Sequence, residues 1–415
     1  MPDAVIKWTD VLLDLIRHTG GSPCPIARGG AMMYGAIYNA VNSIVPLFQP
    51  YRFSVPAPST ASLDAAVAYA AHDTLAAAFS HSTFDLSAAL QKALSTLPPG
   101  TSVGDIAAGK WVGQEAARAM VQDRANDGSN NNTPYINGTN PGEWRPTGSG
   151  EAASPNWPSV RPFCINIGAQ FRLWRPGGYA SRTEMLQSRE YAAQVNEVQA
   201  LGRYDSAVRT EEQTEIAFFW ANDLDGTYKA PGHLYDITKA VSARRNLDIV
   251  QNARMFALVG LTVADAALTA WDQKYATDLD LWRPETAIRE ADSDGNPDTE
   301  QDECWEPLSQ DRDGAHFSPP FPGYISGHST MSAAYAGLMR EHLGTDNVTF
   351  TATTDDPHAH GVTRPFNSFL QLALESLSSR VYLGVNFRWD AENGFLAGTG
   401  LGRFVFTNFL RPLTA

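Results

Sequence analysis

Apolar residues recur at helical spacing along most of this chain. Residues 26–45 carry apolar side chains three and four positions apart, as in a helix with one buried face. The same periodicity, or a run rich in alanine and leucine, predicts helices over 61–80, 84–95, 104–124, 182–200, 209–222, 236–273, 327–343 and 365–383. Strand-like alternation is scarce. The pattern therefore predicts a mainly α-helical protein.

One long segment, residues 126–180, interrupts the helical pattern. It is rich in glycine, proline, asparagine and serine, yet it also contains Trp144, Trp157, Phe163, Phe171 and Trp174. A disordered linker would carry few aromatic residues, so we expect an ordered loop that covers part of the structure. The chain then reads as one domain over 1–415, with an N-terminal helical half (1–125), this loop, and a C-terminal helical half (181–415).

Composition narrows the class of protein. The 415 residues are 43% hydrophobic and 18% charged, and the formal net charge is −14. An acidic chain is a poor partner for nucleic acid, which attracts basic surfaces. Three dispersed cysteines form neither a disulfide framework nor a zinc motif. The N-terminus lacks the basic start and long apolar run of a secretory leader, and Asp265 interrupts the most apolar stretch. We expect a soluble, cytoplasmic protein that binds no membrane.

Three short motifs in the C-terminal half carry chemistry. They are Lys274 followed by Trp282-Arg283-Pro284, the run PPFPGYISGHST with Ser326-Gly327-His328, and Ser379-Arg380 followed by Asn386 and Asp390. Arginine offers a planar fork to oxyanions. A Ser-Gly-His sequence that opens a helix points free backbone N–H groups and the positive end of the helix dipole at an anion. Each motif alone is weak, but the three in this order predict an oxyanion pocket.

The motifs resemble those of the vanadium-dependent haloperoxidases, within the superfamily of type 2 phosphatidic acid phosphatases. Further similar stretches are AMMYGAIYNAVNSI, EVQALGRYDSAVRTEEQTEIAFFW, APGHLYDI, ARMFALVGLTVADAALTAWDQKY and DSDGNPDT. The resemblance implies an all-α fold of two fused helical bundles and a homodimer. It also implies an oxyanion shell and an acid–base histidine. The shell residues are Lys274, Arg283, Ser326, Gly327 and Arg380, the acid–base group is His328, and Asp390 orients the residue at position 386.

Three departures from the family pattern change the expected chemistry. Asn386 stands where the family has the histidine that binds vanadium, and an amide is neither a good ligand for that metal nor a nucleophile. Ile325 replaces a proline before Ser326. Lys274 and Arg283 are nine residues apart, two more than usual, which turns the helical phase by roughly half a circle if the helix continues. We therefore expect no metal ligand and no cofactor, with phosphate or another oxyanion able to occupy the pocket.

The resemblance further implies a particular reaction. A vanadium-independent branch of the family in napyradiomycin biosynthesis rearranges α-hydroxyketones on a prenylated naphthoquinone-derived meroterpenoid. The catalytic set would be Lys274, Arg283, His328, Arg380 and Asp390. The groups that bind the hydrophobic aromatic or terpenoid substrate would be Ser326, Gly327, Asn386, Trp282 and Phe321. Three alternatives stay open: a vanadium-dependent chloro- or bromoperoxidase, an engineered His-to-Asn variant of one, and a protein that only binds an oxyanion.

Two other features are interpreted as structural in preference to functional. The acidic run DSDGNPDTEQDE has its glycine fourth and a proline sixth, which does not match the spacing of a calcium loop, so we expect a turn. His233 follows Pro231-Gly232 and is interpreted as a helix-start residue in preference to a catalytic one.

Overall fold

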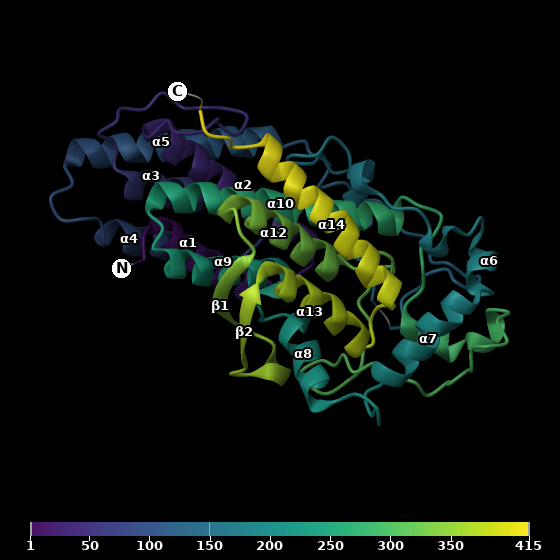
Figure 1. Ribbon diagram of the computed structural model, residues 1–415. Helices are drawn as coiled ribbons and strands as arrows, with labels where there is room; N and C mark the ends of the chain where they lie inside the picture. The colour runs from purple at the N-terminus through teal and green to yellow at the C-terminus, as the bar shows by residue number, and fades with distance from the viewer. Residues whose placement is uncertain (1, 149, 414–415) are drawn as a thin grey trace.

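Helix α10 (Ile249–Tyr275) lies between an N-terminal and a C-terminal group of helices (Figure 1). The computed structural model describes residues 2–148 and 150–413. The N-terminal group contains α1 (Ala4–Thr19), α2 (Pro23–Ile44), α3 (Leu63–Ala78), α4 (Leu86–Ser95) and α5 (Val103–Arg124). After the long loop come α6 (Arg182–Leu186), α7 (Arg189–Leu201), α8 (Glu211–Ala221), α9 (Lys229–Arg245), α11 (Pro284–Arg289), α12 (Gly327–Leu343), α13 (Phe369–Tyr382) and α14 (Arg388–Asn408). The predicted all-α fold of two fused helical bundles is confirmed.

Helix α10 joins the two groups because it is apolar on almost every side. It starts at a capping box in which Asp248 and Gln251 satisfy each other's backbone N–H groups. It packs mainly on α2 and α12. It is long and apolar enough to cross a membrane, yet 94% of its most apolar window is buried inside the protein. Burial by other helices accounts for that apolarity, and the cytoplasmic location stays a prediction.

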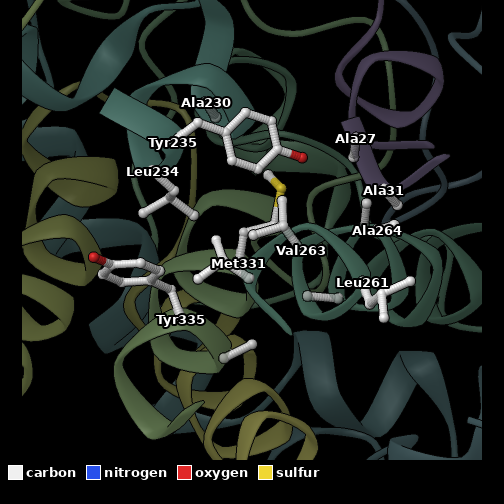
Figure 2. Close-up of a cluster of buried hydrophobic side chains, with 14 of the residues drawn as sticks. Ala27, Ala31, Ala230, Leu234, Tyr235, Leu261, Val263, Ala264, Met331 and Tyr335 are labelled. Atoms are coloured by element: carbon white, nitrogen blue, oxygen red, sulfur yellow. The ribbon is translucent and has the colours of Figure 1, made fainter. Parts of the chain in front are cut away.

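Side chains from four helices meet in the core between the two groups (Figure 2). They come from α2, α9, α10 and α12, and their labelled members are Ala27, Ala31, Ala230, Leu234, Tyr235, Leu261, Val263, Ala264, Met331 and Tyr335. Small alanines face larger aromatic and branched residues, so the helices approach closely. This core fixes α12 relative to α10, and both helices carry residues of the predicted motifs.

Helices α12 and α14 make the closest contact in the C-terminal group. A Cβ atom on Gly398 would lie 2.2 Å from the carbonyl oxygen of Thr330, and one on Gly402 would lie 2.0 Å from that of Ala334. Only glycine fits at such distances, so these positions let the two backbones touch. The contact brings the N-termini of both helices together, where the Ser326 N–H donates to the Asp390 carbonyl oxygen at 2.9 Å.

Several sequence predictions need correction. Residues 236–273 form two helices, because Asn246 adopts a left-handed conformation (φ 51°) and Asp248 caps a new start. Residues 365–368 belong to β2 (Thr363–Ser368), which pairs antiparallel with β1 (Asn347–Thr353). Residues 347–353 alternate polar and apolar side chains, as a strand does, and their burial alternates in the same way. Helices α1 and α14 were not predicted, the latter because glycines dilute its pattern.

A carboxylate of α10 anchors part of the segment between α5 and α6. Asp265 on α10 accepts the backbone N–H groups of Phe163, Cys164 and Ile165 at 2.7, 2.7 and 2.9 Å. The segment contains three short 3-10 turns, and Trp144 and Trp157 are buried in it, whereas Trp174 is 92% exposed. Asp265 thus anchors a stretch of chain that has little regular structure of its own.

Candidate functional site

The start of helix α12 forms one wall of the site. Ser326 is the N-cap residue, and its Oγ accepts the Ser329 N–H at 3.3 Å. The N–H groups of the first helical turn, including that of Gly327, have no partner within the helix. Ser326 and Gly327 are both buried. The partial positive charge of a helix N-terminus is therefore presented inside the protein, where it favours an anion.

Two buried arginines leave N–H donors without a partner among the described residues. Arg283 donates from Nε to the Phe321 carbonyl oxygen at 2.8 Å and from Nη1 to that of Val385 at 2.7 Å, while its Nη2 is unpaired. Arg380 donates from Nη2 to Asp223 at 3.1 Å, while its Nε and Nη1 are unpaired. Buried donors are normally satisfied. Three donor atoms on two cations are therefore available to the oxygen atoms of an anionic ligand.

Lys274 is fully buried beside the same loop. Its Nζ donates to the carbonyl oxygens of Pro322 and Gly323 at 2.6 and 3.0 Å. Helix α10 ends at Tyr275, one residue later, so the two additional residues before Arg283 lie in non-helical chain and do not turn the lysine away. Burial, and then the charge of Arg283, hold the pKa of Lys274 well below its usual range. The Lys274 side chain therefore donates hydrogen bonds to the loop that precedes Ser326.

His328 is available as a base at neutral pH. Its Nε2 lies 3.0 Å from the Ala221 carbonyl oxygen, and because a carbonyl only accepts, the proton is on Nε2 and the lone pair is on Nδ1. Burial, and then the charge of Arg380, lower the pKa of His328 to about 4. The ring is therefore neutral above that pH and can take up a proton.

Asp223 belongs to the site, although no sequence motif pointed to it. Its carboxylate pairs with Arg380 at 3.1 Å and lies 3.9 Å from His328 Nε2. Burial opposes its ionisation, but His328, Arg380 and Lys229 outweigh this and keep the pKa of Asp223 below its usual value. It follows helix α8, far from all three motifs in sequence. Only the fold brings this counter-ion to Arg380.

Asn386 and Asp390 close the other side of the site. The Asn386 Nδ2 donates to the Gly323 carbonyl oxygen at 3.0 Å and to Asp390 Oδ2 at 3.1 Å. Asp390 Oδ2 also accepts the Phe387 N–H at 3.0 Å, and its Oδ1 has no partner among the described residues. Burial raises the pKa of Asp390 to about 6. Asn386 precedes α14, so Asp390 reaches it as a residue of the first helical turn.

The two aromatic candidates have different positions. Trp282 is fully buried and its Nε1 donates to the Tyr191 hydroxyl at 3.1 Å, so it packs beside the site from the core, and its role in substrate binding stays a prediction. Phe321 is half-buried, with Arg283 and Lys274 above its ring at 4.7 and 5.1 Å. Phe321 is the aromatic residue at the edge of the site.

His233 is also close to the site, within helix α9. It is buried, its Nδ1 lies 3.1 Å from Asn222 Nδ2, and burial lowers its pKa to about 4. His233 and His328 both line a small cavity of about 10 Å³, roughly enough for one water molecule. The place of His233 inside α9 differs from the helix-start position expected from the sequence.

The acidic run is a turn in which Asp294 accepts the Asn296 N–H at 2.7 Å.

These contacts fit a tetrahedral oxyanion but not a metal–nitrogen bond. The two arginines and the start of α12 supply hydrogen-bond donors for oxygen atoms. Both hydrogens of the Asn386 amide already have acceptors, and an amide nitrogen has no lone pair to give a metal. Vanadate, the group that the resemblance implies, would find its oxygen-binding residues here without its nitrogen ligand.

Comparison with known proteins finds sequence similarity to vanadium chloroperoxidases. The model of the vanadium chloroperoxidase (VCPO) second helical-bundle domain matches residues 254–414. Vanadium chloroperoxidase of Curvularia inaequalis is 28% identical over 266 residues, which cover 52% of this chain and 42% of that protein, so the match spans less than half the length of this relative.

Solved structures extend the similarity to the whole chain. A bacterial vanadium-dependent iodoperoxidase has a TM-score of 0.81 and 26% sequence identity, covering 98% of this chain and 96% of that one. A bacterial vanadium-dependent chloroperoxidase in its holo form has a TM-score of 0.73 and 16% identity, covering 94% and 93%, and shows a shared fold. The sequence matches and the shared fold show that this chain is similar to vanadium haloperoxidases and has their helical architecture.

Proposed function

We propose that this chain catalyses a vanadium-independent acid–base reaction, the rearrangement of an α-hydroxyketone. The observation that carries the proposal is the combination of three unpaired guanidinium donors with a neutral histidine, beside an asparagine that cannot supply a nitrogen ligand. Such a pocket stabilises negative charge on oxygen and can accept a proton. An isomerisation needs those two capacities and no oxidant.

The proposed step conserves all atoms and electrons. His328 Nδ1 removes the proton of the substrate hydroxyl, and the resulting alkoxide forms a carbonyl group as one carbon substituent moves, with its bonding pair, to the adjacent ketone carbon. The former ketone oxygen becomes an alkoxide, which Arg283 and Arg380 stabilise through their free N–H groups. That oxygen then takes back the proton from His328. The product is an isomeric α-hydroxyketone.

The substrate class is a finer part of the proposal. We propose a hydrophobic aromatic or terpenoid substrate, specifically a prenylated naphthoquinone-derived meroterpenoid intermediate of the napyradiomycin type, acted on by a homodimer. Support comes from the sequence resemblance and from Phe321, whose half-buried ring lies under Arg283 and Lys274 and offers an apolar surface next to the cations.

A vanadium-dependent haloperoxidase is the second candidate. The observation that favours it is the similarity over the whole chain to a vanadium-dependent iodoperoxidase, together with retention of Lys274, Arg283, Ser326, Gly327, Arg380 and His328. In that reaction the bound vanadate would supply peroxide activation. Here the protein would contribute the oxygen-binding donors and His328 as the proton carrier, without a nitrogen ligand from position 386.

One set of measurements separates the two candidates. Purified protein is incubated with vanadate, desalted and analysed for vanadium, then assayed for peroxide-dependent bromination and for isomerisation of α-hydroxyketones followed by NMR. The rearrangement predicts isomerisation without vanadium and no bromination. Stoichiometric vanadium with bromide oxidation would reject it in favour of the haloperoxidase.

Substitutions of two histidines test whether His328 is the base. His328→Ala should lower isomerisation by at least about a hundredfold, the usual contribution of a general base. His342→Ala is the matched control, because His342 is on the same helix and its pKa is also lowered to about 4 by burial. Equal turnover in the wild type and His328→Ala would exclude His328 as the base.

A further inference from the structure

The orientation of the Asn386 amide is determined by its neighbours. Nδ2 donates to the carbonyl oxygen of Gly323 and to the carboxyl group of Asp390. A backbone carbonyl only accepts hydrogen bonds, so turning the amide around would place Oδ1 against the oxygen of Gly323. The Gly323 oxygen also accepts from Lys274 Nζ at 3.0 Å, which fixes its position. Both hydrogens of Asn386 are therefore used within the protein.

The remaining polar atom of that side chain, Oδ1, is an acceptor without a partner. None of the hydrogen bonds among the described residues involves it, and it is not among the unpaired atoms that are sealed from solvent. Asn386 lies next to both arginines: its N–H donates to the Arg380 carbonyl oxygen at 3.3 Å, and the preceding Val385 carbonyl oxygen accepts from Arg283 Nη1. Asn386 therefore adds an acceptor to a site in which Arg283 and Arg380 have unpaired donors.

We propose that Asn386 makes this pocket select ligands that carry a hydroxyl hydrogen beside their oxygen acceptors. A ligand with oxygens only would leave Oδ1 desolvated and facing another acceptor, which is costly in a buried site. Monohydrogen phosphate satisfies both kinds of group, whereas sulfate lacks the hydrogen. The inference rests on the oxyanion pocket of the proposed function and names the class of anion that this pocket selects.

Three tetrahedral anions measure how much the hydroxyl group of the ligand contributes to binding. Phosphate, monofluorophosphate and sulfate are titrated into the wild-type protein by calorimetry at constant ionic strength and pH 7. Monofluorophosphate has the shape of monohydrogen phosphate and the charge of its dianion, with fluorine in place of the hydroxyl. We expect phosphate to bind about tenfold more tightly than either of the others, the ratio that one charge-assisted hydrogen bond gives.

A substitution assigns the selectivity to Asn386. Asn386→Leu removes the acceptor and should abolish the preference, so that phosphate binds about as tightly as the other two anions. Asn408→Leu, at the exposed far end of α14, should leave the preference at about tenfold. Equal binding of the three anions by the wild type would overturn the inference and leave the oxyanion pocket standing, as would a preference unchanged in Asn386→Leu. Binding of none of them would overturn the pocket and the proposed function as well.

Discussion

Asn386 and Asp390 are joined by a hydrogen bond of 3.1 Å from Nδ2 to Oδ2 at the start of helix α14. The same carboxylate oxygen accepts the Phe387 N–H, so a buried acid of the first helical turn holds the residue just before the helix. The amide therefore has one orientation in the site. The consequences for metal binding, anion binding and stability can each be tested.

Replacing the amide by an imidazole should create vanadate binding. Asn386→His supplies a ring nitrogen with a lone pair at the position where Nδ2 has none, and Asp390 is placed to hold the other ring nitrogen. We expect vanadate affinity to rise at least about tenfold over the wild type, because loss of even an outer-shell partner of a metal ligand changes metal affinity by about that factor. Equilibrium dialysis with elemental analysis measures it. Asn386→Gln is the control, and equal affinity of the two variants would show that the divergence from the family extends beyond position 386.

Removing two of the unpaired donors should weaken oxyanion binding. Arg380→Lys keeps a positive charge next to Asp223 but loses the planar fork to which Nε and Nη1 belong. We expect phosphate affinity, measured by calorimetry, to fall about tenfold. Arg118→Lys is the control, because Arg118 forms an exposed ion pair with Glu115. Unchanged affinity in Arg380→Lys would mean that its unpaired donors do not face the anion.

Removing the carboxylate of Asp265 should destabilise the loop between α5 and α6. Asp265→Asn turns one of the two accepting oxygens into a donor that opposes backbone N–H groups of Phe163, Cys164 and Ile165. At pH 7 we expect the free energy of unfolding to fall by roughly 2–3 kcal/mol, the cost of unsatisfied buried groups. Urea titration measures it. Asp278→Asn is the control, because its side chain is 84% exposed, and equal loss in both variants would contradict the anchoring role.

Buried histidines should make stability fall on acidification. Burial lowers the pKa of His342 to about 4 from a usual value of 6.5, so the unfolded chain binds the proton first as the pH drops. Its stabilising contribution is complete above pH 6.5 and is lost as the pH approaches 4. Between pH 7 and 5 this amounts to about 2 kcal/mol.

The comparison must be made against a variant, because other groups act in the opposite direction. Burial raises the pKa of Asp265 and of Asp356 to about 6, so these carboxyl groups stabilise the fold as the pH falls. His342→Gln removes one histidine and leaves those groups in place. Its loss of unfolding free energy between pH 7 and 5, from urea titrations, should be smaller than that of the wild type by about 2 kcal/mol. An identical loss in both proteins would contradict a lowered pKa.

The sequence was sufficient to identify the helical class and the residues of the three motifs. Periodicity indicated α2, α3, α5 and α12 within a few residues of their observed ends. It failed where local signals and tertiary contacts differ: the αL residue Asn246 splits one apolar run into two helices, and α14 is helical despite its glycines because those glycines pack on α12. A pattern of side chains does not report such close backbone contact.

Residue identities by themselves determined that position 386 lacks the histidine of the family motif and that two arginines, a Ser-Gly-His turn and a lysine are retained. The tertiary structure decided which atoms of those residues are free. It brought Asp223 to Arg380 from the end of α8, ended α10 at Tyr275 so that Lys274 reaches Pro322, and used both hydrogens of Asn386. Hydrogen-bond availability depends on the acceptors that surround a donor, and the acceptors at Pro322, Asp223 and Gly323 come from segments more than forty residues away from their donors.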